Sequence, residues 1–143
     1  MSCPYFEPVE PSPRSTDARL ALMPLGNAWA GTCHADSQET VQPEESALRP
    51  LCNMGYARGI CPRFPADDNG PDAARFTISQ DNGAFLRLYY VLERDYQPFA
   101  HGPLEYALDR ESFTTAPAGL LTDRQARAYV ASYLWRKAAV RER

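Results

Sequence analysis

The chain has 143 residues, of which 44% are hydrophobic and 11% aromatic, so it is long enough for one domain with a buried core. Its net charge is −3, and residues 1–121 alone carry nine basic and sixteen acidic side chains, which argues against broad nucleic-acid binding. No run approaches the roughly 18 apolar residues of a membrane span, and the N-terminus lacks the pattern of a secretory signal. We therefore expect a cytoplasmic protein that does not bind a membrane.

Residues 1–65 are predicted to form a loop-rich half. More than half of the thirteen prolines precede residue 51, and the apolar residues there follow no sustained period. Ser15-Thr16-Asp17 predicts the cap of a helical turn that ends before Pro24. Pro43-Glu44-Glu45 predicts a second short helix through about Leu48. A loop region of this length is unusual in a compact domain unless another feature, such as a metal centre, holds it together.

Residues 74–107 are predicted to form a β-hairpin region. Apolar and polar residues alternate over residues 74–79, and Asp81-Asn82-Gly83 is typical of a tight turn. Residues 85–93, FLRLYYVLE, then predict a second strand, with residues 86, 88, 90 and 92 on one face and residues 85, 87, 89 and 91 on the other. The chain is expected to return after residue 97 as a third strand, which Pro98 and Pro103 would confine to an edge or interrupt.

Residues 122–141 are predicted to form an amphipathic helix. Thr122 and Gln125 match the spacing of a capping box, in which the two side chains satisfy free backbone amides reciprocally. Residues 126, 129, 130, 133 and 134 fall on one apolar stripe, which we expect to pack on the hairpin. The predicted fold is thus a small α+β single domain spanning residues 1–143, with a metal-stapled N-terminal half.

The four cysteines all lie in the loop-rich half. Cys3, Cys33, Cys52 and Cys61 follow the spacing C-x29-C-x18-C-x8-C, and each has a turn-like setting with nearby Gly or Pro. Three interpretations compete: buried thiols that act as small apolar residues, two disulfides, and one four-thiolate metal centre. Disulfides are rare in reducing compartments, and packing cysteines should sit in periodic apolar segments. We therefore favour the metal centre.

The spacing favours an iron–sulfur cluster over zinc. Structural zinc sites usually draw their ligands in close C-x2–4-C pairs, and the chain has none. Four thiolates from four separate loops suit a larger inorganic core, as in iron–sulfur clusters. Cys-Pro occurs at residues 3–4 and 61–62, where the proline stiffens a ligand loop. A [4Fe–4S] cluster is the first choice, and [2Fe–2S] and zinc are the alternatives.

Four residues near the cysteines are expected to support the centre without binding it. His34 adjoins Cys33 and is predicted to donate a hydrogen bond to the ligand shell. Arg58 and Arg63 flank Cys61, where positive charge would lower thiolate pKa values and offset a negative cluster. Gly59, like Gly31 and Gly55, is expected to let backbone amides approach the sulfurs.

The function predicted from this centre is electron transfer or redox sensing, because four protein ligands leave no iron open to a substrate. The alternative is a zinc-stabilised interaction module without redox activity. A third possibility is an enzyme that uses one cysteine as a nucleophile, although no catalytic motif supports it. Residues 122–143 carry a net charge of +4, so a protein redox partner or an acidic partner is expected to dock on the C-terminal helix.

Overall fold

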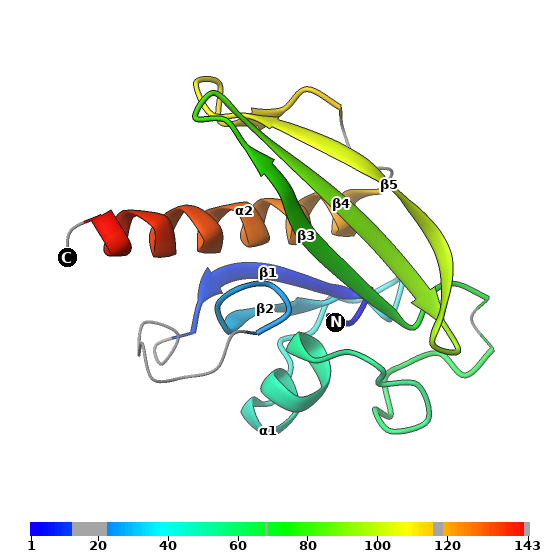
Figure 1. Cartoon of the computed structure of the whole chain (residues 1–143). Helices are drawn as coiled ribbons and strands as arrows, with labels where there is room; N and C mark the ends of the chain where they lie inside the picture. Colours follow the sequence, from blue (N-terminus) through cyan, green and yellow to red (C-terminus); the bar gives the residue numbers. More distant parts are fainter. Residues whose placement is uncertain (13–22, 68, 116–118, 142–143) are drawn as a thin grey trace.

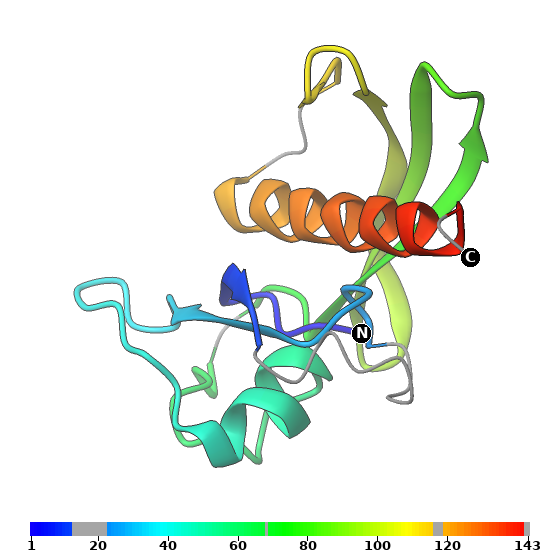
Figure 2. The same cartoon turned by 90° about the vertical axis from the view of Figure 1, so that its left-hand side faces the viewer.

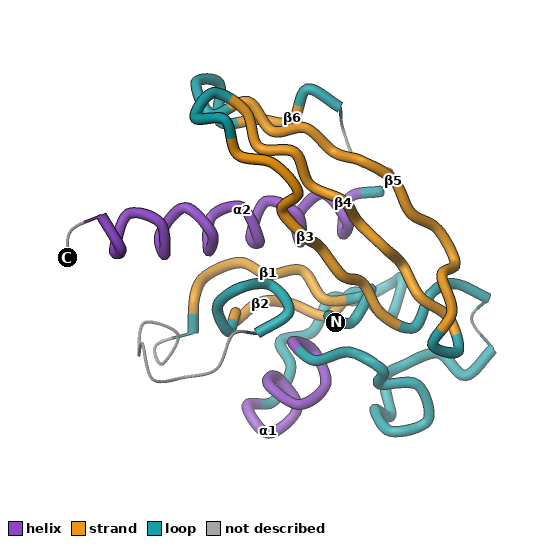
Figure 3. Tube along the Cα trace, in the orientation of Figure 1, coloured by secondary structure: helices purple, strands orange, loops and turns teal. Residues whose placement is uncertain are grey.

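A computed structural model describes residues 1–12, 23–67, 69–115 and 119–141 of the chain. Figure 1 shows the path of the chain, and Figure 3 shows its helices and strands. The elements in chain order are β1 (Phe6–Pro11), β2 (Trp29–Cys33), α1 (Glu45–Ala47), the π-helical segment η1 (Leu48–Asn53), β3 (Ala73–Asp81), β4 (Phe85–Arg94), β5 (Gln97–Ala107), β6 (Ser112–Phe113) and α2 (Leu120–Arg141).

The predicted hairpin is confirmed as β3 and β4, the first two strands of an antiparallel sheet of order β3-β4-β5-β6. The turn between them is fixed by Asn82, whose side-chain oxygen accepts hydrogen bonds from the backbone N–H groups of Ala84 and Phe85. The two faces of β4 divide as predicted. Leu86 and Leu88 are fully buried, whereas Phe85 and Tyr89 are exposed on the other face.

The third strand is also confirmed, and it lies at the edge of the sheet over most of its length. β5 pairs with β4 along its whole length. On its other side, only the last two residues of β5, Tyr106 and Ala107, pair with β6. Pro98 and Pro103 are therefore tolerated, since an edge strand leaves one side of its backbone without ladder partners. Asp95 and Tyr96 close the tight β4–β5 turn with positive φ angles, as the twist of such hairpins requires.

The N-terminal half contains two strands that the sequence did not predict. β1 and β2 form an antiparallel two-stranded sheet, with Phe6 opposite Cys33 and Pro11 opposite Trp29. Gly31 is required where they pair, because a Cβ atom there would lie 1.9 Å from the Glu7 carbonyl oxygen. The prolines of β1 weaken its strand pattern. The helical turn predicted at residues 15–22 lies outside the described residues.

The short helix predicted after Pro43 is present, but it continues further than expected. It begins as α1 at Glu45 and then widens into η1, which extends to Asn53. Pro50 explains the wider turns, since its ring would clash with the carbonyl four residues earlier in a regular α-helix. The widened segment carries Cys52, one of the four predicted ligands.

The C-terminal helix begins two residues before the predicted start, and the predicted capping box is wrong. α2 starts at Leu120, so Gln125 lies beyond its first turn and is 1% exposed. The helix packs against β3, where Tyr129 contacts Phe76, and also against β1. Figure 2 shows α2 between the larger sheet and the β1–β2 pair. The α+β class is confirmed, and the core is shared among both sheets and this helix.

One salt-bridged carboxylate ties α2 to the β3–β4 turn and predicts a pH dependence of stability. Asp81 accepts hydrogen bonds from Lys137 and Tyr133, at 2.7 Å each, and these bonds lower the pKa of Asp81 to about 2. Its stabilising effect is present above the ordinary pKa of about 4 and is lost as the pH falls through about 2. We expect Asp81→Asn to lower the free energy of unfolding at pH 7 by about 1–2 kcal/mol.

Urea unfolding at pH 7 and pH 2 measures this effect. The difference between Asp81→Asn and the original protein should nearly vanish at pH 2. An equal difference at both pH values would show that the contribution is not ionic.

No helix within the described ranges has both the length and the apolar character needed to cross a membrane.

Candidate metal centre

The four cysteines come together around one cavity. Cys3 precedes β1, Cys33 ends β2, Cys52 lies in η1, and Cys61 lies in the turn that follows. All four line a cavity of about 20 Å³. Four segments, separated by up to 58 residues in the sequence, thus contribute a cysteine to the wall of one cavity.

Backbone hydrogen bonds hold the four segments in this arrangement. The Cys3 N–H donates to the Cys52 carbonyl at 3.0 Å, which joins the N-terminus to η1. Cys33 pairs with Phe6 across β1 and β2 and also exchanges hydrogen bonds with Val41. The Cys61 N–H donates to the Ala57 carbonyl at 2.8 Å in a turn. These main-chain hydrogen bonds therefore fix the backbone positions from which the four thiol side chains extend.

Two buried amide side chains fix the loops further. Asn53 accepts a hydrogen bond from the Trp29 N–H at 2.9 Å and donates to the Trp29 and Leu48 carbonyls, so it fastens η1 to β2. Gln125 of α2 donates to the carbonyls of Cys3 and Phe6 at 2.7 Å each. Both amides are nearly inaccessible to solvent and hold the residues that flank the cysteines.

Sequence reasoning missed both amides as supports of the site. Asn53 had no local signal beyond its place next to Cys52. Gln125 was visible as a polar residue beside the apolar stripe of the helix, but its spacing from Thr122 suggested a cap.

The cavity walls exclude water from two of the thiols. Cys3 and Cys52 are 7% and 9% exposed, whereas Cys33 and Cys61 are half-buried. Phe64 lines the cavity and meets the ring of Tyr5 edge to face, with 5.3 Å between the ring centroids. The other apolar wall residues are Phe6, Ala35, Leu51 and Ala57. Cys33 and Cys61 thus lie on the solvent side of an otherwise apolar enclosure.

The environment of the buried thiols keeps them protonated in the absence of a metal. Burial, together with a smaller effect of negative charge on the other three cysteines, raises the pKa of Cys3 to about 12. A hydrogen bond from the Tyr5 backbone to the sulfur acts in the opposite direction. Burial likewise raises the pKa of Cys52 to about 12, against the charge of Arg63. A protonated, buried thiol is a poor nucleophile, which disfavours a catalytic role for these two cysteines.

The two arginines predicted to support the centre have different environments. Arg63 lines the cavity and pairs with Glu44 at 4.0 Å. Its charge opposes the rise in the pKa of Cys52, and its predicted effect on a bound cluster stays a prediction. Arg58 forms an ion pair with Asp72 at 2.6 Å and lies over the Phe64 ring, 4.7 Å from the centroid. Arg58 therefore packs on Phe64, a wall residue of the cavity, and does not line the cavity itself.

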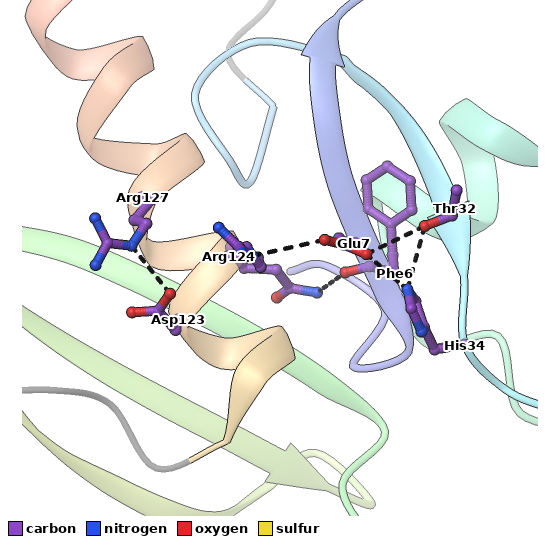
Figure 4. A network of polar contacts seen from close by, with 8 residues as sticks. Phe6, Glu7, Thr32, His34, Asp123, Arg124 and Arg127 are labelled. Carbon is purple, nitrogen blue, oxygen red and sulfur yellow. Dashed lines mark hydrogen bonds and ion pairs between the residues drawn. The ribbon is translucent and has the colours of Figure 1, made fainter. Parts of the chain in front are cut away.

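His34 lies beside the site in the sequence, but its ring makes other contacts. Its Nε2 atom is 2.7 Å from Glu7 Oε1 and 3.2 Å from the Thr32 hydroxyl, as Figure 4 shows. Glu7 also pairs with Arg124 of α2 at 3.6 Å, so this network links β1, β2 and α2. Glu7 and Thr32 both contact the same ring nitrogen of His34. In a nucleophilic triad, the carboxylate and the hydroxyl contact different ring nitrogens, so this network is not a triad.

The three glycines near the cysteines lie in a turn or close to neighbouring backbone, and the predicted approach of their amides to the sulfurs stays a prediction. Gly59 has φ of +81° and open space around it, so it serves the turn before Cys61. Gly31 and Gly55 lie against the backbones of Glu7 and Met1. The amide that bonds the sulfur of Cys3 belongs to Tyr5, which is not a glycine.

The arrangement of the thiols differs from that of a site for one ion. All four cysteines lie within the described residues, and none of them forms a disulfide. Across the described ranges, no three or more His, Cys, Asp and Glu side chains form a group that could hold a single metal ion. The cavity nevertheless combines four thiols, apolar walls, one arginine and an amide N–H on a sulfur, which are chemical features that thiolate metal centres use.

The exposure of the thiols predicts an order of chemical modification. In metal-free protein at pH 8, iodoacetamide should modify Cys33 and Cys61 well before Cys3 and Cys52, because the latter are buried and protonated. We expect a difference of at least about tenfold in rate, measured by mass spectrometry of peptides. Equal rates at all four positions would contradict the enclosed geometry.

The comparisons with known proteins add no assignment: the chain matches no protein-family profile and has no match among curated proteins or solved structures.

Proposed function

We propose that this chain binds an iron–sulfur cluster, with Cys3, Cys33, Cys52 and Cys61 as its ligands, and that it transfers electrons or senses redox state. The observation that supports the proposal is the convergence of all four cysteines of the chain on one cavity. Cysteines that serve only as small apolar residues need not lie near one another. An enzyme with one nucleophilic cysteine does not require three more cysteines at the same cavity.

The surroundings of the cavity support a cluster. The charge of Arg63 would offset part of the negative charge of a bound cluster, and the apolar walls would shield its buried side from water. Hydrogen bonds to the sulfurs, such as that from the Tyr5 amide, set the reduction potential of such centres. A bound cluster would supply a one-electron couple, and four protein ligands would leave no iron for a substrate. A [4Fe–4S] cluster remains the first choice and [2Fe–2S] the second.

Zinc is the second candidate, and the size of the cavity favours it. About 20 Å³ accommodates roughly one water-sized body, so the thiols must turn outward to enclose a cluster. Against zinc, the four cysteines do not form a group suited to one ion. A zinc centre would make the chain a structural or interaction module without redox activity.

Metal and sulfide analysis of anaerobically purified protein tests both candidates. The cluster predicts a brown sample that contains iron and acid-labile sulfide in equal amounts and bleaches in air. Zinc in stoichiometric amount without sulfide would select the second candidate. A folded, colourless protein free of both metals would overturn the metal centre altogether.

The partner of an electron-transfer protein is also a proposal. The C-terminal helix was expected to offer positive charge, but several of its cations are paired within the chain. Arg124 pairs with Glu7, Arg127 with Asp123, and Lys137 with Asp81. Docking of an acidic redox partner on α2 therefore has to compete with these pairs and would weaken with salt.

A further inference from the structure

A second and larger cavity lies next to the cysteine cavity. Its volume is about 290 Å³, close to the lower limit for small-molecule sites. Its walls come from five segments: the loop after Cys3, the segment before β3, the strands β3 and β4, and the first two turns of α2. Its lining residues are Pro4, Tyr5, Gly70, Pro71, Ala74, Leu92, Thr122 and Gln125. Tyr5 belongs to the walls of both cavities.

The walls of this cavity select a neutral ligand. None of the eight lining residues carries a charge, so an ion would lose its hydration without gaining a counter-ion. Two prolines, a leucine and the Tyr5 ring present flat or apolar surfaces. Such walls favour a planar, apolar body, such as an aromatic ring.

One side chain that lines the cavity can donate a hydrogen bond to a ligand. The Gln125 amide is already used, since it donates to the Cys3 and Phe6 carbonyls and accepts from Ser2. The side chain of Thr122, in contrast, makes no hydrogen bond to any described residue. An acceptor oxygen on the ligand would satisfy the Thr122 hydroxyl.

We propose that this cavity binds a small, neutral, monocyclic aromatic molecule that carries a carbonyl oxygen. The ring lies among Pro4, Pro71 and Leu92, and the carbonyl accepts from Thr122. The cavity volume limits the ligand to about one ring with short substituents. None of the four cysteines lines this cavity, so its ligand would not contact the proposed metal centre directly.

Titration of the purified protein with benzamide tests the proposal. Benzamide should bind saturably in ligand-observed NMR and should shift the methyl resonances of Ala74 and Leu92. Benzoate has the same ring but carries a charge, and it should bind at least about tenfold more weakly. Absence of saturable benzamide binding to the folded protein, or equal binding of benzoate, would overturn the proposal.

Two variants locate the binding site. Thr122→Val removes the hydroxyl and keeps the shape, and it should weaken benzamide binding about 2–10-fold. Thr122→Phe fills the cavity and should abolish binding, provided that circular dichroism shows a folded protein. Thr77→Val, at an exposed position of β3, serves as the control and should bind like the original protein. Unchanged affinity in Thr122→Val together with Thr122→Phe would overturn the assignment of the site.

Discussion

Under the proposed function, replacing any one of the four cysteines by serine should remove the bound metal, and the four variants should be destabilised to a similar extent. A serine hydroxyl does not ionise near neutral pH, so the variant would offer three ligands instead of four. The binding free energy of a structural four-ligand metal site is on the order of 10 kcal/mol and is coupled to folding. Each variant should therefore lose more than about 3 kcal/mol of the free energy of unfolding of the metal-bound form.

The chain offers a matched control for these variants. Ala35 lines the same cavity without a thiol, so Ala35→Ser introduces the same hydroxyl while all four ligands remain. It should keep the metal. Metal content and thermal unfolding of the five variants, prepared without oxygen, provide the comparison. A single cysteine whose loss abolishes a function while the other three variants stay intact would instead indicate a lone nucleophile.

Gln125→Ala is the second substitution with a large expected effect, although Gln125 lies outside the cysteine-bearing half. The variant would leave the carbonyls of Cys3 and Phe6 and the hydroxyl of Ser2 without their partner in a buried site. One unsatisfied buried polar group costs about 1–3 kcal/mol, and we expect a total loss of about 3 kcal/mol. Because the Cys3 loop is released, metal content should fall as well.

Gln38 supplies the control for this prediction. Its side chain is exposed, so Gln38→Ala should change the free energy of unfolding by less than about 0.5 kcal/mol. Chemical denaturation and iron analysis measure both effects. If Gln125→Ala loses stability but keeps its full metal content, then the amide supports the fold and not the position of Cys3.

The parts of the fold that the sequence predicted are those held together by local interactions. The β3–β4 turn closes over Asn82 and Gly83, and the strands beside it alternate clearly, so the hairpin could be predicted from adjacent residues. The pairing of β1 with β2 could not be predicted in this way. Cys33 lies 27 residues after Phe6, its partner, and the prolines of β1 interrupt the strand pattern.

The candidate site shows the same division. The identities of the four cysteines suggested a shared centre, but only the fold shows that they line one cavity. The supports were harder to predict. Gln125 acts on a carbonyl 122 residues away, and no spacing rule relates the two. The position of His34 next to Cys33 predicts a role at the centre, yet its ring contacts Glu7 of β1.

The contact between Gln125 and the Cys3 loop also has a consequence for the order of events during protein synthesis. All four thiols leave the ribosome before the residues of α2 have been translated, but the clamp on Cys3 forms only once that helix exists. A growing chain thus exposes a complete ligand set that is not yet held in place. Under the proposed function, metal loading follows the completion of α2, and until then the thiols depend on a reducing environment for protection.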